Sequence, residues 1–117
     1  MTELKRIAIF GSTGSIGTQA LEVIAANTDK FSAEILTAHT NETLLIQQAL
    51  QFNPNVVVIG DESKYLKVKE ALSQTGIKVF AGEKALEETA AMNCYDLMLA
   101  GIVGYAGLIP TLQAIEN

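Results

Sequence analysis

Several residue types are scarce in this chain, and each scarcity excludes a class of protein. Cysteine occurs once among 117 residues, at Cys94, so neither an internal disulfide nor a multi-cysteine zinc site can form. Such cysteine usage fits a reducing compartment, and we expect a cytoplasmic protein. No apolar run approaches the length of about 18 residues that a membrane helix needs, so we expect no membrane contact.

Positive charge is also scarce. Eight Lys and Arg residues stand against 13 Asp and Glu residues, which gives a net charge of −5. No group of basic residues could neutralise successive phosphates of a duplex, so we expect no nucleic-acid partner. By contrast, 49% of the residues are apolar and only 18% are charged, which favours one folded domain with a packed core.

Short β-branched segments alternate with longer segments of helical spacing, and this alternation predicts βαβ units. We expect strands at residues 6–10, from 33 to 37 or 38, and at 56–59, 77–80 and 96–100. The fold class is therefore α/β, with a doubly wound, mainly parallel sheet and helices on both faces. Five such units lead us to expect a sixth strand, so the chain resembles a truncated form of this fold.

The expected helices follow from apolar residues at three- and four-residue steps. The first covers 15–26, and the second is marked by Leu45, Ala49 and Phe52 and ends at the Asn53–Pro54 pair. The third helix has an expected buried face of Tyr65, Leu66, Val68 and Leu72, and we expect a left-handed Gly76 to end it. A fourth helix is expected at 83–92, and a last one begins at Leu108.

Three glycines, Gly11, Gly14 and Gly17, form the pattern G-x-x-G-x-x-G between the first strand and the first helix. A helix start presents unpaired N–H groups and the positive end of the helix dipole, so it can hold a pyrophosphate without basic side chains. Gly11 permits the tight exit from the strand, Gly14 admits the phosphates close to the backbone, and Gly17 lets the helix pack closely on the strand. Thr13 and Ser15 add hydroxyl donors. This context predicts a Rossmann-like dinucleotide site; the alternative is a glycine-rich turn that binds nothing.

The end of the second strand bears on the choice between NAD and NADP. A site for NAD has an acid there that bonds the adenosine ribose diol, whereas this chain has Ala38, His39, Thr40 and Asn41. Thr and Asn can donate hydrogen bonds to a 2′-phosphate, and histidine titrates near neutral pH. NADP is therefore favoured over NAD, although Glu42 lies close by in sequence.

Two other function classes share features with this sequence. A phospho-receiver domain has a similar size and alternation, but it needs acids after the first strand and a lysine after the fifth. It also needs a phosphorylatable Asp after the third strand, and Asp61 is the one residue that fits any of these positions. The charges that bind metal and phosphoryl groups are therefore missing. A dinucleotide-sensing domain without chemistry agrees with the glycine pattern and stays open as the alternative.

Two longer segments add a family resemblance. Residues 6–24 (RIAIFGSTGSIGTQALEVI) and 99–115 (LAGIVGYAGLIPTLQAI), together with FNPNVVVIGDE at 52–62, resemble the amino-terminal part of the 1-deoxy-D-xylulose 5-phosphate reductoisomerase family. That family converts 1-deoxy-D-xylulose 5-phosphate into 2-C-methyl-D-erythritol 4-phosphate in non-mevalonate isoprenoid biosynthesis. It uses NADPH and a divalent metal, Mg or Mn. The resemblance implies an NADP-dependent oxidoreductase with a phosphorylated sugar as substrate.

The resemblance also implies roles for individual residues. Thr13, Gly14, Ser15 and Ile16 would touch the dinucleotide phosphates, and Asn41 would meet the adenosine 2′-phosphate with its neighbours His39 and Thr40. Residues 1–117 would then be the NADPH-binding domain. The family's catalytic, metal-binding and carboxy-terminal parts would be absent from the chain, so we assign it no catalytic residue and no metal ligand. An exposed sheet edge or helix face would remain, and we expect self-association there.

Overall fold

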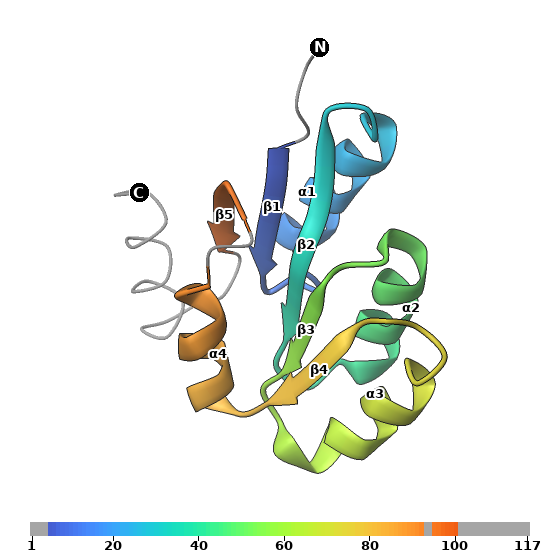
Figure 1. The fold of residues 1–117 in the computed structure, drawn as a ribbon, viewed down its shortest axis with the longest axis vertical. Helices are drawn as coiled ribbons and strands as arrows, with labels where there is room; N and C mark the ends of the chain where they lie inside the picture. The colour runs from blue at the N-terminus through green and yellow to red at the C-terminus, as the bar shows by residue number, and fades with distance from the viewer. Residues whose placement is uncertain (1–4, 93–94, 101–117) are drawn as a thin grey trace.

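A computed structural model describes residues 5–92 and 95–100 of the chain. The described strands are β1 (Lys5–Phe10), β2 (Phe31–Ala38), β3 (Val56–Ile59), β4 (Lys78–Ala81) and β5 (Leu97–Ala100). They form one sheet in the order β4-β3-β2-β1-β5, and all four neighbouring pairs are parallel. The chain thus steps outward from β1 to β4 and then returns to the other side of β1 (Figure 1).

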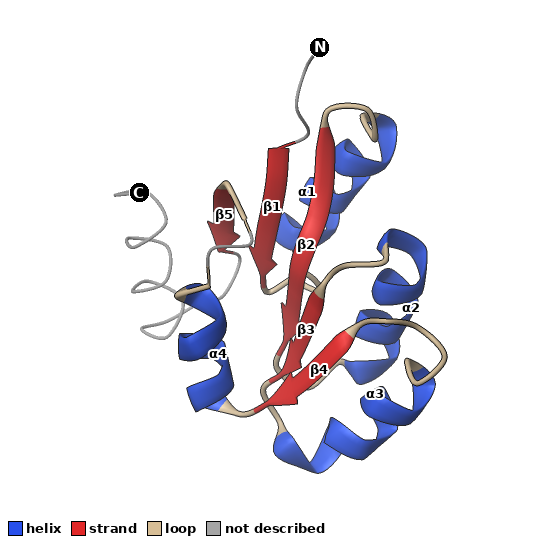
Figure 2. Cartoon of the chain, in the orientation of Figure 1, coloured by secondary structure: helices blue, strands red, loops and turns tan. Residues whose placement is uncertain are grey.

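This reversal places helices on both faces of the sheet. Three helices follow the outward steps and cover one face: α1 (Ser15–Ala26), α2 (Glu42–Phe52) and α3 (Tyr65–Ala71), the last preceded by the 3-10 turn η1 (Glu62–Lys64). The fourth, α4 (Glu83–Ala90), precedes β5 and lies on the other face (Figures 1 and 2). Because crossovers between parallel strands are right-handed, reversing the direction of travel moves the helix to the opposite face.

The predicted fold class is confirmed: the sheet is parallel, doubly wound and Rossmann-like. The same strand order excludes the receiver alternative. A receiver fold has its strands in the order 2-1-3-4-5, with β1 between β2 and β3. Here β1 lies between β2 and β5, and β3 pairs with β2 and β4.

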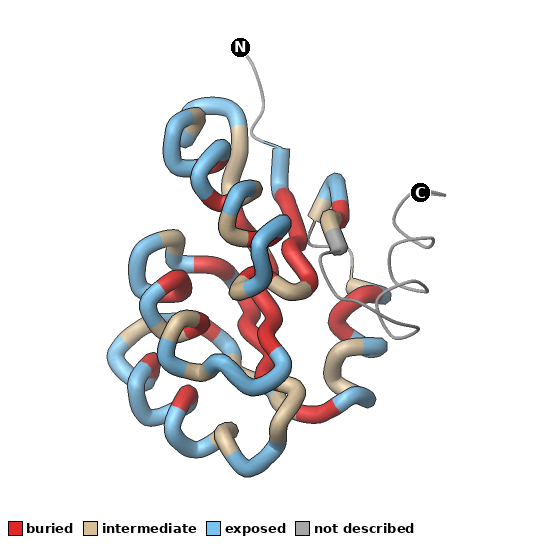
Figure 3. The backbone as a smooth tube through the Cα atoms, turned by 180° about the vertical axis from the view of Figure 1, so that it is seen from behind, coloured by how far each residue is buried: buried red, intermediate tan, exposed pale blue. Residues whose placement is uncertain are grey.

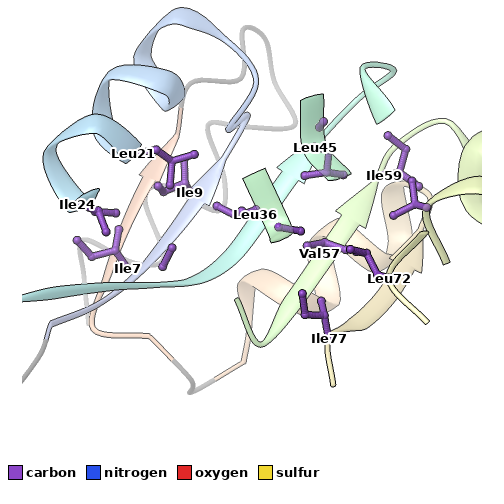
Figure 4. Close-up of a cluster of buried hydrophobic side chains, with 14 residues drawn as sticks. Ile7, Ile9, Leu21, Ile24, Leu36, Leu45, Val57, Ile59, Leu72 and Ile77 are labelled. Atoms are coloured by element: carbon purple, nitrogen blue, oxygen red, sulfur yellow. The ribbon is translucent and has the colours of Figure 1, made fainter. Parts of the chain in front are cut away.

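The strands are apolar almost throughout because both sides of the sheet are covered. Ile7 and Ile9 of β1 point toward α1 and join Leu21 and Leu36 in the larger of two buried clusters (Figure 4). The alternate side chains Ala8 and Phe10 point to the other face, where Ile35, Val58, Ala90 and Met98 form the second cluster. Figure 3 shows the buried segments running along the sheet and along the inner sides of the helices.

Several expected boundaries need correction. The second strand begins at Phe31, two positions before residue 33, and the fourth strand covers Lys78–Ala81 instead of residues 77–80. The fourth helix ends at Ala90 instead of residue 92. The last expected helix, from Leu108, lies outside the described residues, as does Cys94.

The third helix differs most from expectation. It ends at Ala71 with Leu72 as its C-cap, so Gly76 does not terminate it. Within the described ranges, the glycines with positive φ are Gly11 and Gly82, and Gly76 is not among them. The chain leaves the helix through a turn in which the Thr75 hydroxyl donates to the Leu72 carbonyl over 2.7 Å. Leu66, expected on the buried face, is 68% exposed.

No described helix has both the length and the apolar composition that crossing a membrane requires.

Candidate dinucleotide-binding site

The candidate site lies along the carboxyl ends of the strands, which all meet at one edge of the sheet (lower edge in Figure 1). The turn after β1 carries the three glycines, and the turn after β2 carries His39, Thr40 and Asn41. The strand order reverses between β1 and β5, so the glycine turn lies at the switch point of the sheet. In doubly wound folds, ligands bind in the crevice at that point.

The glycine turn has the backbone form that the sequence predicts. Gly11 leaves β1 with a φ of +87°, a left-handed conformation that favours glycine. The Gly14 N–H donates to the Gly11 carbonyl over 3.1 Å and closes the turn. Gly14 is then the N-cap of α1 in an extended conformation, without any side chain to satisfy the helix start.

Gly17 brings the helix against the turn. A Cβ atom built on Gly17 would lie 2.3 Å from the Gly11 carbonyl oxygen and 2.5 Å from the Ser12 Cα. Both are backbone atoms of the hydrogen-bonded turn, so they cannot move aside as a flexible side chain would. The close packing inferred for this glycine is therefore required by the backbone positions.

This geometry leaves donors available at the start of α1. In the described part of the chain, the N–H groups of Thr13, Ser15 and Ile16 have no protein acceptor. Gly14, Ser15 and Ile16 are exposed, and Thr13 is partly exposed. Unpaired N–H groups at the positive end of a helix are the donors that a phosphate group accepts.

Beneath the glycine turn lies a polar network that the sequence analysis did not find. The Gly11 N–H donates to Thr37 Oγ1 over 2.9 Å, and the Ser12 N–H donates to the Thr37 carbonyl over 2.8 Å. Gln48 of α2 also bonds Ser12 through both ends of its side-chain amide. Ser12, Thr37 and Gln48 are all buried. The sequence does show one hint of this network: Gln48 is a polar residue among the apolar positions of α2.

The second turn places its three predicted residues together on the surface. His39, Thr40 and Asn41 are all exposed. Asn41 is the N-cap of α2, and its side-chain oxygen accepts from the Leu44 N–H over 3.2 Å. The cap uses the oxygen of the amide, so its NH2 group keeps its donors for another partner. Since β1 and β2 are neighbours in the sheet, this turn follows the strand beside the glycine turn.

Glu42, the acid nearest the second turn, is paired with two lysines. Its carboxylate lies 3.2 Å from the Lys67 ammonium and 3.6 Å from that of Lys64. Its own backbone N–H and then Lys67 lower the pKa of Glu42 below the usual value of a glutamate, which favours the charged carboxylate. The sequence alone does not place Lys64 and Lys67 beside this turn, because both lie more than 20 positions from Glu42 along the chain.

Asp61 follows β3 at the same edge. The Ser63 hydroxyl donates to its carboxylate over 2.6 Å, and the Ser63 N–H donates over 3.0 Å. These bonds lower the pKa of Asp61 below the usual value of an aspartate, with a smaller contribution from Lys64. Among residues 5–92 and 95–100, no three or more His, Cys, Asp or Glu side chains are grouped so that they could hold a metal ion.

Comparison with known proteins gives a consistent family. A sequence model of 1-deoxy-D-xylulose 5-phosphate reductoisomerase matches residues 7–117. The 1-deoxy-D-xylulose 5-phosphate reductoisomerase of Phocaeicola vulgatus is 52% identical over 112 residues, which cover 96% of this chain and 29% of that protein. That of Bacteroides thetaiotaomicron is 53% identical over 112 residues, with the same two coverages.

A solved structure has the same arrangement of elements. The reductoisomerase of Zymomonas mobilis in complex with NADPH superimposes with a TM-score of 0.89 at 39% identity, covering 97% of this chain and 30% of that one. This chain spans about 29% of the length of the two curated relatives named above. The resemblance seen in the sequence is confirmed by these matches, and the chain belongs to the 1-deoxy-D-xylulose 5-phosphate reductoisomerase family.

Proposed function

We propose that this chain binds NADPH, with the pyrophosphate at the start of α1. The observation that carries the proposal is the set of unpaired N–H groups of Thr13, Ser15 and Ile16 above a glycine turn. Gly17 has no room for a Cβ because the helix start lies directly on the turn. These residues fit a diphosphate, since the dipole of α1 and the backbone donors supply the attraction without a basic side chain.

The adenosine 2′-phosphate would meet the turn after β2. His39, Thr40 and Asn41 are exposed there, and the Asn41 amide keeps its NH2 donors after capping α2. The position of Glu42 next to Asn41 suggests that its charge repels a 2′-phosphate. Because Glu42 is paired with Lys64 and Lys67, this repulsion is reduced. The preference for NADP over NAD is therefore supported by the neighbours of the turn as well as by the missing acid.

We further propose that the whole protein performs the reaction of its family. The solved relative from Zymomonas mobilis contains NADPH, and another solved reductoisomerase contains magnesium; that second structure is 29% identical to this chain and has a TM-score of 0.87. NADPH supplies the hydride when bound, and a divalent cation polarises the oxygens of the phosphorylated sugar. The part of this chain is to hold and orient the dinucleotide. A cytoplasmic location stays part of the proposal.

The proposal is tested by titrating the purified chain with NADPH and with NADH in parallel. We expect NADPH to bind at least about tenfold more tightly, because a 2′-phosphate with two or three hydrogen bonds contributes more than about 1.4 kcal/mol. Isothermal titration calorimetry measures both dissociation constants. Equal affinities would contradict the role of residues 39–41, and no binding of either dinucleotide would contradict the site itself.

Self-association of the chain stays a separate prediction. β4 and β5 are the outer strands of the described sheet, and the exposed apolar side chains Phe80 and Leu97 lie on them. Outer strands with apolar side chains are prone to pair with another chain. We expect sedimentation velocity to show a dimer that increases with concentration. A single monomeric species at the highest soluble concentration would exclude it.

A further inference from the structure

Helix α2 buries one polar side chain, Gln48, on its apolar face. Gln48 is only 6% exposed. Its neighbours on the same face, Leu45 and Ala49, are completely buried. A side-chain amide placed in an apolar environment without partners costs free energy, so such residues occur where partners are fixed. The partners of Gln48 therefore indicate why a polar residue stands at this position.

Both ends of the Gln48 amide contact a single residue of the glycine turn. The Gln48 NH2 group donates to the Ser12 carbonyl over 2.8 Å, and the Gln48 carbonyl oxygen accepts from the Ser12 hydroxyl over 2.7 Å. Ser12 itself has no exposed surface, and its N–H donates to the Thr37 carbonyl. The backbone and the side chain of Ser12 are thus held from two directions.

The bond to the Ser12 carbonyl orients the next N–H group. The carbonyl of Ser12 and the N–H of Thr13 belong to one planar trans peptide unit, in which the two groups point in opposite directions. Because Gln48 holds the Ser12 carbonyl toward α2, the Thr13 N–H is directed away from α2. That N–H has no protein acceptor in the described chain.

We propose that Gln48 is a positioning residue for the pyrophosphate: it fixes the Ser12–Thr13 peptide unit so that the Thr13 N–H faces the bound dinucleotide. This inference rests on the proposed NADPH site. Asn41, the cap of the same helix, lies at the expected 2′-phosphate position. Gln48 therefore also fixes the glycine turn relative to the helix that carries the second anion subsite.

The test compares two ligands in two variants. In Gln48→Met the side chain keeps a similar length but loses both hydrogen bonds, and in Gln48→Glu it loses the NH2 donor and gains a charge. NADPH reports on the pyrophosphate site, whereas 2′-AMP carries the 2′-phosphate without a pyrophosphate. For Gln48→Met we expect NADPH to bind about tenfold more weakly than to the wild type, since a buried carbonyl loses its donor and the turn loosens. We expect the affinity for 2′-AMP to change less than about twofold, because it does not use the peptide unit that Gln48 orients.

Thr89→Val provides the matched control. Thr89 is another buried polar residue, 2% exposed, and its hydroxyl donates to the Ala85 carbonyl within α4 on the opposite face of the sheet. This variant also loses the hydrogen bond of a buried side chain, but we expect its NADPH affinity to stay within about twofold of the wild type. A general loss of stability would affect both variants, so a difference between them isolates the effect on the turn.

The Gln48→Glu variant adds a pH readout and carries the test if Gln48→Met does not fold. A buried carboxyl has a raised pKa, and when protonated it can donate to the Ser12 carbonyl as Gln48 does. We expect its NADPH affinity, relative to wild type at the same pH, to recover as the pH falls from 8 to 6. Wild-type NADPH affinity in folded Gln48→Met, or equal losses for NADPH and 2′-AMP, would overturn the inference. If the wild type binds no NADPH, the proposed function itself fails.

Discussion

Replacing Gly17 by alanine is expected to destabilise the folded chain by about 3 kcal/mol and to abolish NADPH binding. In an open helix the same change stabilises by up to about 1 kcal/mol, because alanine is the better helix former. Here the new Cβ would lie 2.3 Å from the Gly11 carbonyl oxygen and 2.8 Å from the Ser12 carbonyl carbon. The start of α1 must move away from the turn. The N–H groups of the turn and those of the helix start then no longer point toward the same position.

The measurements are urea unfolding for the stability and calorimetric titration for binding. A loss of 3 kcal/mol would lower the melting temperature by about 10 °C in a domain of this size. Gly76→Ala is the matched control, since a Cβ there meets nothing within 4 Å and Gly76 does not have a positive φ. We expect it to change the stability by less than about 0.5 kcal/mol. Comparable losses in the two variants would contradict the close packing at Gly17.

The sequence predicts the fold well because its strands are strongly patterned. Val56–Ile59 is apolar at every position, which is typical of a strand covered on both faces, and the structure buries all four residues. The third helix was less predictable. Its end depends on a turn that the Thr75 hydroxyl stabilises through bonds to the Leu72 carbonyl and the Ile77 N–H, and glycine content alone does not indicate such a turn.

The candidate site also has a part that the sequence predicts and a part that it does not. The exposed part, the glycine turn and residues 39–41, was predicted because its motifs are local. The contacts that hold these turns in place were not predicted. Gln48 is 36 residues from Ser12, and Thr37 bonds Gly11 across 26 residues. Lys67 reaches Glu42 across 25 residues. Only the strand order and the helix positions bring these partners together, so a single sequence without its fold does not show which residues they contact.

These supports explain why the surface donors remain available. Thr37 and Gln48 satisfy the inward-facing groups of Gly11 and Ser12, so the turn needs no further partner from its outer side. Asn41 likewise satisfies the Leu44 N–H with its oxygen while its NH2 donors stay free. Both proposed anion subsites are thus held from within the protein, so a dinucleotide bound there would meet donors that are already oriented. This preorganisation reduces the entropy lost on binding.

Replacing Asn41 by aspartate is expected to reverse the dinucleotide preference with little effect on stability. Aspartate caps helices as well as asparagine does, and its charge interacts favourably with the α2 dipole. The carboxylate loses the NH2 donors and opposes the 2′-phosphate. Two such charges about 5 Å apart repel by about 1–3 kcal/mol at effective dielectric constants between those of water and a protein surface. We expect NADPH to bind about 100-fold more weakly.

NADH is expected to bind Asn41→Asp at least as tightly as the wild type, since a carboxylate can accept from the ribose diol. Titrations with both dinucleotides give the ratio of dissociation constants, and thermal unfolding verifies that the cap is intact. Asn41→Ser is the control, because serine caps a helix without adding charge, and we expect it to weaken NADPH by less than about tenfold. If NADPH affinity is unchanged in Asn41→Asp, the 2′-phosphate lies elsewhere. In that case Lys64, which already reaches Glu42 over 3.6 Å, becomes the residue to replace next.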